Sequence, residues 1–216
     1  MRLSEIIRKL PSHLYLFFGT MLFIFVFPLV DHSSLFDFIG PLSYSIIIIS
    51  ILSVIEKRRG AEFKILTGLI IISLFFIWIM HFFHYRTINV LSFLFNIIVF
   101  VSATIIMIQQ IVASEKVNAR VIIEVINGYL LIGVMFTLTN TFIWGLNPDS
   151  LSIPAAEFSN LVYYSFITIT TIGYGDISPQ TEWAKMASIL FGLMSQLYLT
   201  IIVALIIGKF LNNKNN

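Results

Sequence analysis

One nine-residue segment has the residue types and spacing that could bind an ion. Residues 168–176 read Thr-Ile-Thr-Thr-Ile-Gly-Tyr-Gly-Asp and lie between two long apolar segments. The two glycines allow backbone angles that side chains disfavour, so this strip can run extended with its carbonyl oxygens turned toward one axis. Carbonyl oxygens arranged in this way can replace the water around a dehydrated cation. The segment therefore predicts an ion path lined by backbone oxygen atoms.

The composition fits a membrane protein. Hydrophobic residues make up 58% of the 216-residue chain and charged residues 11%, against about 45–50% and about 25% in soluble domains. The chain has no cysteine and a net charge of +2, so we expect no disulfide framework, no thiolate metal site and no nucleic-acid partner. No catalytic constellation is present, and we expect neither enzymatic activity nor a cofactor.

Six apolar runs are each close to the roughly 20 residues that a helix needs to cross a bilayer. They predict an all-α membrane protein with six transmembrane helices per chain. The expected spans are 13–31, 38–56, 63–83, 89–113, 119–146 and 181–208. We divide the chain into a cytoplasmic amphipathic segment at 1–12, a four-helix sensor-like domain at 13–114 and a pore domain at 115–216.

The distribution of positive charge predicts the orientation of these spans. Of the 13 Lys and Arg residues, all but Arg86 and Lys185 fall on the side that carries both termini. Positively charged loops stay in the cytoplasm. We therefore expect a multi-pass protein of the cell membrane (plasma or inner) with cytoplasmic N- and C-termini.

The connection between the last two spans should re-enter the membrane. Ser159 can cap a short apolar helix that runs to about Thr170. Such a helix is too short to cross a bilayer, and the non-helical strip after it is tolerated at membrane depth only when it is buried or lines a water-filled path. The negative end of the helix would favour a cation in a central cavity.

The sequence Thr-Thr-Ile-Gly-Tyr-Gly-Asp at 170–176 resembles the signature of the tetrameric P-loop potassium channel superfamily. The layout of four helices, then helix, pore loop and helix, is similar to its six-transmembrane-helix members. The resemblance is strong over 119–210 and covers only number and topology in the first four spans. It implies a homotetramer around one pore, because one chain supplies one strip, with the lipid bilayer and K⁺ as the other partners.

The resemblance also assigns roles to individual residues. Carbonyl oxygens of Thr171, Ile172, Gly173 and Tyr174 would bind K⁺, and Gly175 would complete the selectivity filter at 171–175. The residues expected to support the filter are Thr170, Asp176, Tyr163, Tyr164 and Trp183.

The segment before the filter departs from the family pattern. Ile167 stands where some members have a carboxylate, and it cannot pair with Asp176. Tyr163 and Tyr164 replace a tryptophan-rich pair, and their hydroxyls could donate to Asp176 instead. Trp183 is either another neighbour of Asp176 or an anchor at the membrane interface.

The last span should line the inner cavity and carry the gate. Ser195 stands where the family often has a hinge glycine, and Gly192 one turn earlier either serves as the hinge or allows close helix packing. The other residues expected at the cavity or gate share one helical face; they are Gln196, Leu199, Thr200, Val203 and Ile207.

The fourth span lacks the basic residues that a voltage sensor needs. Residues 89–113 contain no Lys or Arg on which a membrane field could do work. His81 and His84, at the outer end of the third span, could sense pH, bind a metal or anchor the helix in the interface. On the fifth span, Asn127 and Asn140 should hydrogen-bond to neighbouring helices.

The sequence thus predicts a potassium-selective channel that conducts passively and is not strongly voltage-gated. The alternatives are a weakly selective cation channel and a non-conducting or transporter-associated pore subunit. The connector between spans four and five has about six residues and reaches only about 20 Å. We therefore expect each four-helix domain to pack beside its own pore domain.

Overall fold

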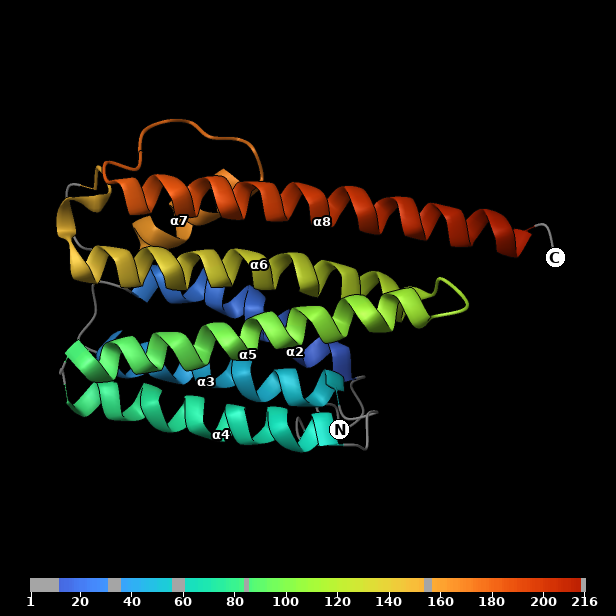
Figure 1. The fold of residues 1–216 in the computed structure, drawn as a ribbon, viewed down its shortest axis with the longest axis horizontal. Helices are drawn as coiled ribbons and strands as arrows, with labels where there is room; N and C mark the ends of the chain where they lie inside the picture. The colour runs from blue at the N-terminus through green and yellow to red at the C-terminus, as the bar shows by residue number, and fades with distance from the viewer. Residues whose placement is uncertain (1–11, 31–35, 56–60, 84–85, 154–156, 215–216) are drawn as a thin grey trace.

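The computed structural model of the chain is an elongated bundle of helices that run along a common axis (Figure 1). It describes residues 12–30, 36–55, 61–83, 86–153 and 157–214. The first helix, α2 (Ser12–Met21), continues as a π-helical stretch (Leu22–Val26) and a 3₁₀ turn (Phe27–Val30). The later elements are α3 (Phe36–Ile55), α4 (Ala61–Phe82), α5 (Arg86–Ala113), α6 (Ala119–Leu146), a 3₁₀ turn (Pro148–Ser150), α7 (Phe158–Ile169) and α8 (Glu182–Lys214).

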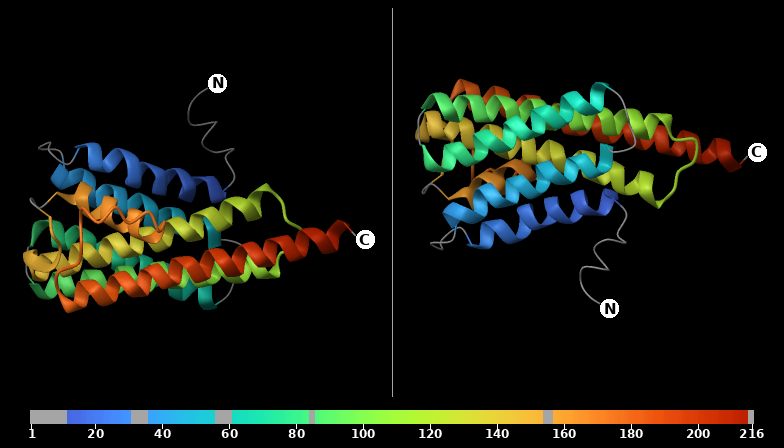
Figure 2. Two further views of the ribbon diagram at one scale, coloured as in Figure 1. Left: turned by 90° about the horizontal axis from the view of Figure 1, so that it is seen from above. Right: turned by 90° about the horizontal axis from the view of Figure 1, so that it is seen from below.

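The long helices alternate in direction, so the start of α2 and the end of α8 lie at the same end of the bundle (Figures 1 and 2). Four described helices are long and apolar enough to cross a membrane: Phe63–Met80 within α4, Arg86–Ala113, Ala119–Leu146, and Glu182–Leu211 within α8. Two shorter apolar stretches, His13–Leu29 and Gly40–Leu52, occupy the first two predicted spans. Each predicted span therefore coincides with a helical segment, and four of them have full spanning length.

One continuous apolar core joins the two halves of the chain. The Phe158 ring at the start of α7 packs edge-on against Phe23 and Phe27, with ring centroids 5.6 and 4.9 Å apart. Phe93 of α5 stacks on Phe142 of α6 with centroids 4.1 Å apart. Such aromatic pairs stabilise packing beyond the area they bury. The four-helix unit (α2 to α5) thus packs directly on α6 and α7 of the same chain.

Local sequence sets where α6 and α7 begin. The Asn118 side chain accepts a hydrogen bond from the Val121 N–H at 3.1 Å and caps α6. The predicted cap of α7 at Ser159 is wrong, because the helix begins at Phe158 and Glu157 occupies the capping position. Phe158, the first residue of the helix, packs its ring against Phe23 and Phe27.

Some predictions concern residues outside the described part of the chain. The amphipathic segment lies there except for Ser12, and so do His84 and the side chain of His81. The roles of His81 and His84 in pH sensing, metal binding or anchoring stay predictions.

Candidate functional site

The short helix α7 is packed between α6 and α8 (Figure 1). Gly133 of α6 makes this close approach possible, since a Cβ at that position would overlap the Phe166 ring. The Asn140 Nδ2 atom donates to Ser165 Oγ at 3.0 Å and joins α6 to α7. Asn127 Nδ2 donates to the His13 carbonyl at 2.9 Å and joins α6 to α2. Both predicted asparagine contacts between helices are therefore confirmed.

The strip after α7 has a regular alternation of backbone handedness. Thr171, Gly173 and Gly175 have φ values of 62°, 51° and 81°, whereas φ is negative at Ile172 and Tyr174. Alternating right- and left-handed residues direct successive N–H groups to one side of the chain. Because C=O and N–H point opposite ways across a trans peptide, the carbonyl oxygens are directed to the other side.

Hydrogen bonds show which side the N–H groups face. The N–H groups of Ile172 and Gly173 both donate to the carbonyl of Ile167 at 3.0 Å, and the Thr171 N–H donates to Thr168 at 3.0 Å. The strip thus turns its donors toward the C-terminal end of α7. In the described part of the chain, the carbonyl oxygens of 171–174 accept no hydrogen bond.

The strip is exposed in a single chain. Residues 170–176 all lie at the surface, and Ile172 and Tyr174 are 54% and 73% exposed. The surface of a fully assembled protein rarely exposes two large side chains next to carbonyl oxygens that accept no hydrogen bond.

The outer end of the strip is fixed by the segment that follows α6. The Ser152 N–H donates to the Ser178 carbonyl at 3.0 Å, and the Gln180 N–H donates to the Ser150 carbonyl at 2.8 Å. The Ser178 N–H also donates to Ser152 Oγ at 2.8 Å. These bonds close the loop, so the strip is held at both ends.

The two tyrosines of α7 have different partners. Tyr163 Oη donates to Asp176 Oδ2 at 2.8 Å, as predicted for one of this pair. Tyr164 Oη instead forms a 2.6 Å hydrogen bond with Ser188 Oγ of α8. Trp183 is 79% exposed and forms no hydrogen bond with Asp176 in the described part of the chain.

The last carbonyl of α7 collects donors from two helices. Ile169 accepts from Tyr129 Oη at 3.0 Å, from Ser195 Oγ at 3.2 Å and from Gln196 Nε2 at 3.4 Å. Tyr129 lies on α6, whereas Ser195 and Gln196 lie on α8. The base of the strip is therefore tied to both helices, and sequence reasoning missed Tyr129.

The residues predicted for the cavity do not all share one surface. Ser195 is fully buried against α7. Ser195 therefore does not line a cavity as predicted, because its hydroxyl donates to the Ile169 carbonyl. Gly192 has open space where a Cβ would stand, so close packing does not require this glycine within one chain. The remaining predicted residues are exposed or half-buried on α8; they are Gln196, Leu199, Thr200, Val203 and Ile207.

The inner end of α8 is bound to the end of α5, a contact that sequence reasoning also missed. Lys209 Nζ donates to the carbonyls of Ile111, Val112 and Ser114 at 2.8, 2.6 and 2.6 Å. A cation at this position satisfies the free carbonyls of a helix C-terminus and opposes its partial negative charge. The only available signal was a lysine at the end of an apolar span, which is usual at a membrane interface.

Comparisons with known proteins find similarity in this part of the chain. Residues 129–212 match the model of a family described as ion channel. Two-pore potassium channel 5 of Arabidopsis thaliana is 29% identical over 80 residues, which cover 37% of this chain and 20% of that protein. Two-pore potassium channel 2 of the same plant is 30% identical over 109 residues, which cover 50% of this chain and 23% of that protein. No solved structure matches the chain.

The matched region is therefore similar to an ion channel family and distantly similar to potassium channels. The matched family is one of ion channels and not of enzymes. With four apolar helices of spanning length, the chain is a multi-pass membrane protein. The chain spans less than a quarter of the length of the curated relatives that it matches.

Proposed function

We propose that four copies of this chain form a potassium-selective channel that conducts passively across the cell membrane, with both termini in the cytoplasm. The alternation of φ at Thr171, Gly173 and Gly175 carries this proposal, because it turns unpaired carbonyl oxygens to one side of the strip. Four such strips around an axis would surround a K⁺ ion with oxygen in place of water. The ion sites would be the carbonyls of 171–174.

Two further observations support a symmetric assembly. A single strip provides carbonyl oxygens on one side of an ion only, so several chains must share the axis. The side chains of Ile172 and Tyr174, within the strip, are exposed in one chain, and neighbouring subunits would cover them. In that assembly we propose six spans per chain, 13–114 as a four-helix domain and 115–216 as the pore domain, with each four-helix domain beside its own pore domain.

We also propose that the channel is not strongly voltage-gated. Each elementary charge that crosses the membrane contributes about 2.3 kcal/mol per 100 mV. Within α5 the only charged residue is Arg86, at its first position. The membrane field therefore has no row of charges to move on this helix.

The experiment is bi-ionic recording from the purified protein in a planar bilayer, with K⁺ on one side and Na⁺ on the other. We expect a reversal potential that shows strong preference for K⁺ and an open probability that changes little with voltage. Gly173→Ala would force a side chain into the left-handed region, which costs about 1–2 kcal/mol. This strain should displace the carbonyl oxygens of the strip, so we expect the reversal potential of the variant to show a weaker preference for K⁺.

Gly68→Ala is the matched control, because Gly68 lies on α4 with open space around it and without a positive φ. It should leave selectivity unchanged. A reversal potential near zero would favour a weakly selective cation channel, and absence of current from the folded protein would favour a non-conducting or transporter-associated subunit.

A further inference from the structure

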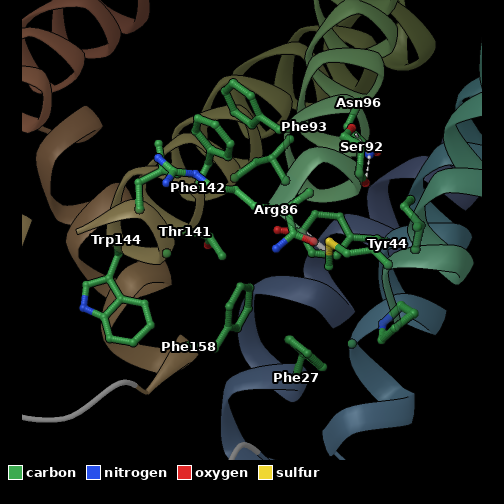
Figure 3. Close-up of a pocket in the computed structure, with 18 residues that line it drawn as sticks. Phe27, Tyr44, Arg86, Ser92, Phe93, Asn96, Thr141, Phe142, Trp144 and Phe158 are labelled. Carbon is green, nitrogen blue, oxygen red and sulfur yellow. Dashed lines mark hydrogen bonds between the residues drawn. The ribbon is translucent and has the colours of Figure 1, made fainter. Parts of the chain in front are cut away.

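A cavity of about 540 Å³ lies between the four-helix unit, the outer end of α6 and the first residue of α7 (Figure 3). If each non-hydrogen atom of a ligand takes up about 30 Å³, the volume of one water molecule in the liquid, the cavity has room for roughly 18 such atoms. Its wall is mostly apolar and rich in aromatic rings, which come from Phe27, Phe93, Phe142, Trp144 and Phe158. Pockets of this size and lining are typical of small-molecule sites.

Two residues that line the cavity each have a buried oxygen atom without a hydrogen-bond partner in the described part of the chain. These atoms are Tyr44 Oη and Asn89 Oδ1. Other polar residues of the wall are already satisfied: Asn96 Nδ2 donates to the Ser92 carbonyl at 2.7 Å, and Asn96 Oδ1 accepts from Ser73 Oγ at 2.9 Å. Buried polar groups usually have hydrogen-bond partners. A ligand head group that reaches Tyr44 and Asn89 would supply the partners that the protein does not.

The cavity has one charged residue, at its edge. Arg86, the first residue of α5, is exposed and lines the cavity (Figure 3). No hydrogen bond or ion pair joins its guanidinium to another residue that the structure describes. The N-terminal end of α5 adds partial positive charge at the same place. The cavity therefore combines an apolar body with a cationic edge.

We propose that this cavity binds a fatty acid, a single-chain amphiphile with one carboxylate. The carboxylate would pair with Arg86 and accept a hydrogen bond from Tyr44 Oη, and the Asn89 amide can turn its NH₂ group to the same head. The alkyl chain would lie among the aromatic rings. Room for roughly 18 non-hydrogen atoms fits a chain of about 12 to 16 carbons.

Occupancy of this site would affect the pore domain. The cavity wall includes Arg86 and Asn89 of α5, Phe142 and Gly145 of α6, and Phe158 of α7. A ligand bound across these helices favours the arrangement in which they stay packed together. The site does not depend on which ion the pore passes, so it can be tested separately from the proposed function.

The test measures binding of radiolabelled dodecanoate to the full chain in lipid nanodiscs at pH 9, with empty nanodiscs as the measure of partition into lipid. We expect one saturable site per chain, with an affinity about tenfold higher than that of dodecanol, because only the acid gains a charge-assisted bond. Arg86→Gln should abolish this preference, whereas Arg86→Lys should keep most of it.

Gly145→Leu separates the volume of the cavity from its charge. Gly145 lines the cavity with open space where a Cβ would stand, so the larger side chain should weaken binding of both dodecanoate and dodecanol. Gly68→Leu, on α4 and away from the cavity, is the matched control and should change neither. Uptake that does not saturate, or equal affinity for the acid and the alcohol, would overturn the proposal and indicate that bilayer lipid chains fill the cavity.

Discussion

Thr171 has a φ of 62°, a left-handed conformation that costs a residue with a side chain about 1–2 kcal/mol. Hydrogen bonds hold it there, from its own N–H to Thr168 and from the N–H groups of Ile172 and Gly173 to Ile167. Strain of this kind persists where the surroundings over-determine the backbone, and it gathers at functional sites. At the residue scale, the strip is therefore shaped by its own backbone together with the end of α7.

The residue-scale prediction concerns the bond that holds the outer end of the strip. Tyr163→Phe removes the donor to Asp176 while it leaves the ring in place. We expect the potassium current to decay several-fold faster while the channel is held open, because Asp176 is then free to move. The measurement is the decay of current in symmetrical potassium solutions.

Tyr164→Phe is the control for this change, because its hydroxyl bonds Ser188 on α8 and not Asp176. It should leave the rate of decay nearly unchanged. Equal acceleration by both substitutions would show that the bond between Tyr163 and Asp176 has no special role at the mouth of the filter.

At the element scale, α8 has two different faces. One face packs on α6 and α7 and consists of Ala184, Ala187, Phe191, Ser195, Tyr198 and Ile202. The opposite face exposes large apolar side chains such as Leu193, Leu197 and Ile201. Tyr198 Oη donates to the Val125 carbonyl at 2.8 Å, directly beside Gly128. The inner helix is thus fixed along α6 and, through Lys209, at the end of α5.

The element-scale prediction is that Lys209→Gln loosens the end of α5. The substitution removes a cation that binds three carbonyls of a helix C-terminus. We expect a loss of about 1 kcal/mol in the free energy of unfolding. Hydrogen exchange at 112–118 should be faster, as measured by mass spectrometry.

Lys185→Gln is the matched control, because Lys185 is an exposed lysine near the other end of the same helix. It should change neither stability nor exchange at 112–118. If the two variants behaved alike, the contact between α8 and α5 would contribute nothing measurable.

At the scale of the whole molecule, a single chain leaves the proposed ion path open on one side. The strip from 170 to 176 is exposed, and only 22% of the apolar stretch of α8 is buried in one chain, against 67% of α6. Lipid can cover apolar side chains, but it cannot satisfy the carbonyl oxygens of the strip. These carbonyls therefore require water, ions or other subunits.

The prediction at this scale is an assembly of four chains. Native mass spectrometry of the protein in mild detergent should give a principal species of four times the mass of one chain. Tyr174→Ala should weaken this species, because Tyr174 is 73% exposed in one chain and would be covered by neighbouring subunits. A monomer or dimer as the largest species would contradict the proposed assembly.

Much of the pore domain could be predicted from the sequence. Apolar runs of spanning length predicted the helices, and the position of the Gly-Tyr-Gly strip predicted the short helix before it and the non-helical backbone within it. Asn127 and Asn140 were identified because an amide within an apolar span needs a partner. These features depend on local composition and on the cost of unsatisfied polar groups in lipid, and both can be read along the chain.

Only the tertiary structure decided which distant residues meet. The convergence of Tyr129, Ser195 and Gln196 on one carbonyl, the binding of Lys209 to the end of α5 and the cavity beside Arg86 all depend on the rotation and offset of packed helices. The sequence by itself determined the helices and the glycine-containing strip at 168–176, because these arise from neighbouring residues. Rotation and offset arise from side-chain fit between helices, to which residues far apart in the chain contribute equally.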